Sequence, residues 1–78
     1  MVKIVEEKKL DASTVMITIE GDKPSELSDV AAKEMAYAAR LNHGLASAGI
    51  SSEGGIYPTT EDDKTTKFRK EFKLWAGL

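Results

Sequence analysis

Large apolar side chains are scarce in this chain, because valine, isoleucine, leucine and phenylalanine together account for only 17 of its 78 residues. A chain of this length buries about 60–65% of the surface that it exposes when unfolded. Its core can therefore be no more than one thin layer between two elements. We expect a single small domain over residues 1–78 with modest stability, whose core a partner or a second copy would help to complete.

The chain has no cysteine and one histidine, which removes several classes of protein. Without thiolates there is no disulfide framework, cysteine nucleophile, thiolate zinc site or iron–sulfur cluster. His43 has no second histidine for a metal site and no serine at a motif spacing for a catalytic triad. We interpret His43 as the last residue of a helix, where a cation suits the dipole. The sequence thus predicts no metal and no cofactor.

No stretch of the sequence is apolar enough for a secretory signal or a membrane span. Five of the first nine residues are charged, where a signal sequence would need an apolar run. This pattern predicts a cytoplasmic protein without a membrane partner.

Two strands joined by a tight turn are predicted near the N-terminus. From Thr14 to Glu20, β-branched residues alternate with more polar ones, which is the period of a half-buried strand. The segment Val2–Leu10 is a second strand, and its run of charged residues favours the edge of a sheet. The residues between them, Leu10–Ser13, would close an antiparallel hairpin.

A helix is predicted to follow, from Pro24 to about Leu41. Proline suits the first turn of a helix, and Gly44 after His43 supplies a left-handed cap. Glu34 falls inside the apolar stripe of this helix, so we expect its carboxylate at the margin of the stripe, paired with a base, or facing a partner. The stripe on a continuous helical wheel consists of Leu27, Val30, Ala31, Met35, Ala38 and Leu41.

Residues 45–55 are small and rich in glycine and serine, which is typical of a flexible connection. The segment Ile56–Thr60 follows as a short edge strand, because Pro58 cannot donate a hydrogen bond to a central ladder.

The last segment has two interpretations. As a strand from Thr65, it has two faces, and the acidic residues before it form a turn. One face carries Thr66, Phe68, Phe72 and Leu74 together with Lys70, and the opposite face carries Lys67, Arg69, Glu71 and Lys73. As a helix capped by Thr60, it places the phenylalanines and Trp75 together. We favour the strand. The fold class is then α+β, a two-layer antiparallel sheet of three or four strands packed against one main helix in the order ββαββ, and the alternative is ββα with a C-terminal helix.

Charge is unevenly distributed along the chain. The net charge is −2, yet residues 64–75 hold five basic residues against Glu71 alone. Basic groups neutralise phosphates and aromatic faces stack on bases, so this segment is a candidate nucleic-acid platform. If its phenylalanines belong to the core, the bases form an outer face that docks an acidic protein surface or is simply solvated. The candidate binding residues are Lys67, Arg69, Lys70, Lys73 and Trp75, together with Glu34 on the helix.

Other motifs carry little chemistry. The acids of residues 61–63 lack the alternation of a calcium loop, and Gly54–Gly55 lacks the lysine of a phosphate loop. The acids of the helix are typical of a solvated face. We therefore expect no enzyme but a non-catalytic module that binds a protein as a regulator, adaptor or inhibitor, like the small accessory proteins of phages. Nucleic-acid binding through residues 64–75 is the alternative, and an exposed strand edge offers a route to a homodimer.

Overall fold

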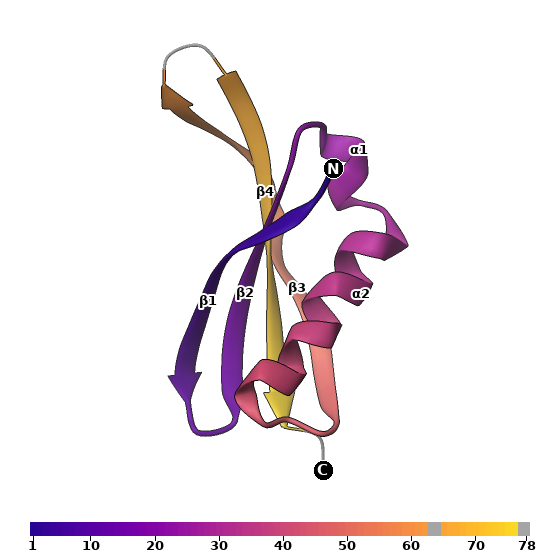
Figure 1. Ribbon diagram of the computed structural model, residues 1–78, viewed down its shortest axis with the longest axis vertical. Coiled ribbons are helices and arrows are strands. Elements are labelled where there is room, and N and C mark those ends of the chain that lie inside the picture. The colour runs from indigo at the N-terminus through magenta and orange to yellow at the C-terminus, as the bar shows by residue number, and fades with distance from the viewer. Residues whose placement is uncertain (63–64, 77–78) are drawn as a thin grey trace.

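The computed structural model describes residues 1–62 and 65–76, and its helices lie on one face of a four-stranded antiparallel sheet (Figure 1). The strand order in the sheet is β1-β2-β4-β3. The predicted ββαββ order is confirmed, and the alternative with a C-terminal helix is wrong, because the last strand pairs with a neighbour on each side. The elements are β1 (Lys3–Asp11), β2 (Thr14–Gly21), α1 (Pro24–Leu27), α2 (Val30–Ala38), the 3-10 helix η1 (Ala39–His43), β3 (Ala48–Asp62) and β4 (Thr65–Ala76).

The N-terminal hairpin forms where the period-2 pattern predicts it. The Asp11 side chain fixes its turn, because Oδ1 accepts the Ser13 backbone N–H at 2.8 Å. That hydrogen bond holds the pKa of Asp11 below its usual value. Strand β1 is an edge of the sheet, as its run of charges indicates.

The core lies between the helices and the two central strands. The register of β2 and β4 places Val15 opposite Leu74 and Ile17 opposite Phe72, and all four side chains are buried. On the helical side the buried residues are mostly alanines, which let the helix axis approach the sheet closely while the strands supply the volume. The helix and loop residues of this core are Leu27, Ala32, Ala36, Ala39 and Leu45.

The predicted continuous helix is wrong, because it is interrupted after α1. Ser28 ends α1, with its hydroxyl donating to the Ser25 carbonyl at 3.1 Å, and Asp29 is extended before α2 begins. Serine and aspartate compete with helical hydrogen bonds in this way. The break shifts the helical phase, so Val30 and Leu41 from the expected stripe are 66% and 62% exposed. Pro24 at the start and Gly44 in the left-handed region at the end are confirmed.

Most of the predicted connection is instead a strand. Residues 48–53 pair with β4, and the irregularity expected from the glycines is confined to a bulge between Glu53 and Tyr57. Gly54 within it has φ +74°, a conformation that glycine adopts without strain. The predicted strand Ile56–Thr60 is the second half of β3, and it lies at a sheet edge as Pro58 requires.

The strands of the C-terminal hairpin run beyond the rest of the sheet (Figure 1). The ladder between β2 and β4 ends where Gly21 pairs with Phe68, whereas β3 and β4 continue to the pair of Asp62 and Thr65. Among residues 1–62 and 65–76, no third strand pairs with this end of the hairpin, which is a two-stranded ribbon.

Candidate functional site

The helices leave one face of the sheet uncovered, and we call it the open face (Figure 1). Side chains alternate between the two faces of each strand, so every residue paired across the sheet with an open-face residue also lies there. The open face consists of Lys3, Glu6, Lys8 and Asp11 of β1, Thr14, Met16, Thr18 and Glu20 of β2, Lys67, Arg69, Glu71, Lys73 and Trp75 of β4, and Gly49, Ser51, Glu53, Tyr57 and Thr59 of β3.

The structure brings four of the six predicted site residues together. Lys67, Arg69, Lys73 and Trp75 lie along the open face of β4, where every second residue points, and Glu71 lies between Arg69 and Lys73. Lys70 points the other way, toward the helices. The strand interpretation of this segment likewise separates Lys70 from Lys67, Arg69 and Lys73, and the register confirms that separation.

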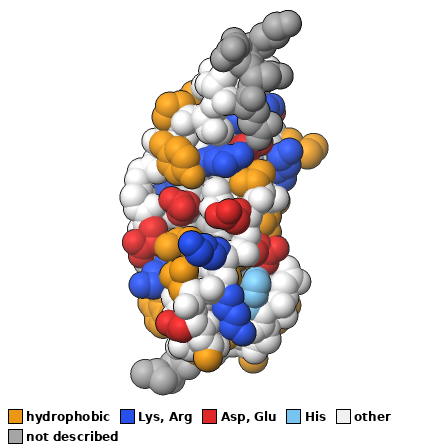
Figure 2. Space-filling model, turned by 90° about the vertical axis from the view of Figure 1, so that its left-hand side faces the viewer, with side chains coloured by type: hydrophobic (Ala, Val, Ile, Leu, Met, Phe, Trp, Pro, Cys, Tyr) orange, Lys and Arg blue, Asp and Glu red, His pale blue; other side chains and the backbone are white. Residues whose placement is uncertain are grey.

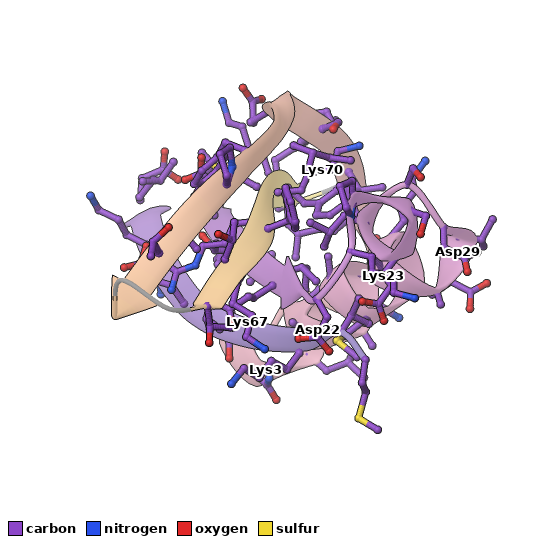
Figure 3. All side chains as sticks on the ribbon, turned by 90° about the horizontal axis from the view of Figure 1, so that it is seen from above. Lys3, Asp22, Lys23, Asp29, Lys67 and Lys70 are labelled. Atoms are coloured by element: carbon purple, nitrogen blue, oxygen red, sulfur yellow. The ribbon has the colours of Figure 1, made fainter. Side chains whose placement is uncertain are left out.

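Lys70 lies between the helices and the sheet (Figure 3). Its Nζ is 5.4 Å from the centre of the Phe72 ring, close enough for a cation–π contact. It lines a hollow of about 220 Å³ together with Asp29 and Lys33, where the chain passes from α1 to α2. Glu34 is exposed on α2, and it forms no ion pair with a base among residues 1–62 and 65–76.

Basic groups of the open face are in part already neutralised by acids of the same chain. Arg69 Nε donates to Glu20 Oε2 at 3.0 Å, and Lys3 Nζ lies 3.9 Å from the other oxygen of that carboxylate. Glu20 is only 3% exposed, because these longer side chains cover it. A buried carboxylate is tolerated only with such partners.

Lys67 forms an ion pair with Asp22 at the end of the sheet where α1 begins (Figure 3). The Met1 ammonium joins the same cluster, 3.3 Å from Asp22 Oδ2 and in contact with Glu26. The Lys67 hydrogen bond is the main reason that the pKa of Asp22 lies below its usual value. The hydrogen bond from the Met1 ammonium lowers the pKa of Glu26.

Two aromatic side chains are partly exposed on the open face. Trp75 is 40% exposed and its indole lies on Gly49 of the neighbouring strand, where a Cβ atom would overlap with the ring. Tyr57 is 38% exposed, and burial together with the nearby Glu71 carboxylate raises its pKa. The two phenylalanines of the predicted platform face the helices instead, and Phe72 is buried.

Sequence reasoning missed Glu20, Asp22 and Tyr57. Glu20 occupies the polar side of an alternating strand, which predicts exposure, and only the register shows that Arg69 is placed beside it. Asp22 lies next to the start of α1, where Glu26 accepts the backbone N–H groups of Asp22 and Lys23. No local signal in the sequence identifies these neighbours.

His43 lies at the end of η1, as predicted, but it has a partner. Its Nε2 is 2.8 Å from Glu7 Oε1 on β1, so the pair joins the end of the helical segment to the edge of the sheet. Residues 1–62 and 65–76 contain no group of three potential ligands that could hold a metal ion. Over the same residues, no helix has the length and apolar character needed to cross a membrane.

Comparison of the sequence with protein-family models and with curated proteins, and of the structure with solved structures, finds no match.

Proposed function

We propose that this protein is a non-catalytic module that binds a protein partner through the open face of its sheet. The observation that carries the proposal is the composition of that face, where two partly exposed aromatic side chains, Trp75 and Tyr57, lie among acids and bases of both signs. Exposed aromatic residues and arginine are typical anchors of protein interfaces. The mixture of charges suits a partner that also carries both signs.

The pairing of the basic groups argues against phosphate as their main ligand. Arg69 is hydrogen-bonded to Glu20, and Lys67 is paired with Asp22, so a phosphate would compete with carboxylates already in place. The acids Glu53 and Glu71 lie opposite each other on neighbouring strands and would repel a polyanion. The alternative of nucleic-acid binding retains one supporting observation, which is that Lys67, Arg69, Lys73 and Trp75 share a face.

We infer that the protein acts as a regulator, adaptor or inhibitor in the cytoplasm, without a small-molecule cofactor. The hollow beside Lys70 and a second one beside Lys67 measure about 220 and 210 Å³. Small-molecule sites usually enclose about 300–1,000 Å³. Because both hollows are smaller than this range, we favour a broad protein interface on the open face over a small-molecule pocket.

The decisive comparison uses one substitution on each face. Glu71→Lys changes the open face, and Glu34→Lys makes the same change on the exposed side of α2. The proposal predicts that partner proteins captured by the wild type are lost with Glu71→Lys and retained with Glu34→Lys, as measured by quantitative mass spectrometry. Loss with Glu34→Lys alone would move the interface to the helices.

Nucleic-acid binding is tested by titrating the protein with a single-stranded oligonucleotide and with a duplex at two salt concentrations. Trp75 is the only tryptophan, so its fluorescence reports on the open face. We expect no saturable change. A change that weakens steeply with salt, and that Lys73→Gln reduces while Lys70→Gln on the opposite face does not, would establish the alternative.

A further inference from the structure

In the part of the chain that the structure describes, no strand lies beside the outer edge of β1. It is the first strand of the sheet order, and all its residues from Glu6 to Asp11 are exposed. Figure 2 looks at this side of the molecule and shows acidic and basic side chains intermixed over it. An edge strand presents a row of unpaired backbone N–H and C=O groups, which another strand can pair with.

The charged side chains of β1 that lie on the open face alternate in sign along the strand. Two irregularities in the β1–β2 ladder, one on each side of the centre of the strand, shift the alternation of its side chains. As a result the open face of β1 carries, in order, Lys3, Glu6, Lys8 and Asp11. Glu6 and Lys8 at the centre form no ion pair within the part of the chain that the structure describes.

This alternating row is symmetric about Glu7. If a second copy ran antiparallel with its Glu7 opposite this one, Glu6 would face Lys8 of the second copy, and Lys8 would face Glu6 of the second copy. Lys3 and Asp11 would face each other in the same way at both ends. Opposite charges directly across an antiparallel pair stabilise it, whereas like charges destabilise it.

Neighbouring registers that keep the same face lose this complementarity. A two-fold axis at Lys8 would place Lys8 against its own copy, and an axis at Glu6 would do the same for Glu6. The axis at Glu7 brings together two Glu7 carboxylates on the other face. Each of these is drawn toward its own helix by the 2.8 Å contact with His43.

We propose that β1 pairs with β1 of a second copy, antiparallel and centred on Glu7, and joins the two sheets into one of eight strands. The two-fold axis is normal to the sheet, so both open faces lie on the same side. Leu10, 46% exposed in one copy, meets Ile4 of the other in this register. The pairing does not rest on the proposed partner binding, because it uses the backbone edge of β1 and leaves Trp75 and Tyr57 of the open face uncovered.

The test is sedimentation equilibrium of the whole chain over a range of concentrations. We expect the wild type to dimerise and Glu6→Lys to raise the dimer Kd about tenfold or more, because two attractive pairs become repulsive. Lys8→Glu should weaken self-association equally. Lys73→Glu, on a central strand, is the matched control and should leave the Kd unchanged. Circular dichroism verifies that each variant is folded.

A second experiment exchanges the charges of Glu6 and Lys8 between chains. A mixture of the Glu6→Lys and Lys8→Glu chains should form a heterodimer, and the double variant should recover the homodimer. A wild type that stays monomeric up to about 1 mM overturns the proposal. A dimer that is insensitive to both single substitutions also overturns it, since the pairing must then use another surface such as the β3 edge.

Discussion

The two faces of β4 are built from alternating residues of one strand, yet their side chains differ in burial and in the contacts they make. On the side of the helices, Phe72 and Leu74 are buried and belong to the same hydrophobic cluster as alanines of α2 and η1. On the open face, Arg69 is hydrogen-bonded to Glu20 and the Trp75 indole lies on Gly49. The Lys73 side chain on the same face is partly exposed to solvent. The difference shows that stability and recognition can be separated within one strand, because neighbouring positions of a strand never share a face.

The largest expected contrast lies between Leu74 and its neighbour Lys73. Leu74→Ala removes a fully buried side chain and leaves a cavity, which should lower the free energy of unfolding by about 2–4 kcal/mol. Lys73→Ala on the open face should change it by less than about 0.5 kcal/mol. Urea denaturation followed by circular dichroism measures both, and equal effects would break the division between the two faces.

The open face has one buried charge, and its removal tests whether that face also carries stability. Arg69→Met leaves the carboxylate of the Glu20 side chain, which is 4% exposed, with Lys3 at 3.9 Å as its remaining cation among the described residues. We expect the free energy of unfolding to fall by about 1–3 kcal/mol, because a buried acceptor loses its charged donor. Lys73→Met is the control on the same face of the same strand. No loss with Arg69→Met would show that water replaces the guanidinium.

The contact between Trp75 and Gly49 gives a smaller effect. Gly49→Ala should displace the indole, shift its emission to longer wavelength and cost about 1 kcal/mol. In a Trp75→Phe background the same substitution should be less costly, and the difference between the two costs is the coupling between the residues. Denaturation of the four chains of this cycle provides the measurement, and additivity would contradict the contact.

The smallest effects concern the exposed acids beside α1. The folded state lowers the pKa of Asp22 and Glu26, so their pairing stabilises the fold above the ordinary values of 3.8 and 4.5. This contribution is lost as the pH falls below those values. Lys67→Met should raise the pKa of Asp22 and affect Glu26 little, since the Met1 ammonium is the main partner of Glu26. NMR titration of the side-chain carboxyl carbons distinguishes them.

Much of the sheet could be predicted from the sequence, because its central strand is a local pattern. The alternation from Thr14 to Glu20 places three β-branched residues on the core side, and β2 forms there. The first half of β3 could not be predicted in this way, since Ala48–Glu53 has little strand character of its own and is held by its pairing with β4. The helical wheel failed at Ser28, where a continuous phase was assumed.

The candidate surface was predicted only in part. A spacing of two places Lys67, Arg69 and Lys73 on one face once the strand is known, and it separates Lys70 from them. The acids that neutralise this face come from β2 and from the turn before α1, about 45 residues away in the chain for Lys67 and Asp22. Such partners depend on strand order, which local patterns do not determine.

The ribbon of β3 and β4 beyond Phe68 also determines where local unfolding of the sheet begins. Two strands without a third neighbour are marginally stable in water. Their backbone amides should exchange with deuterium through local fraying, whereas those of β2 between two strands should exchange only when the whole domain unfolds. We therefore expect spontaneous opening to start at the pair of Asp62 and Thr65 and the open face to lose its order from Lys67 toward Trp75.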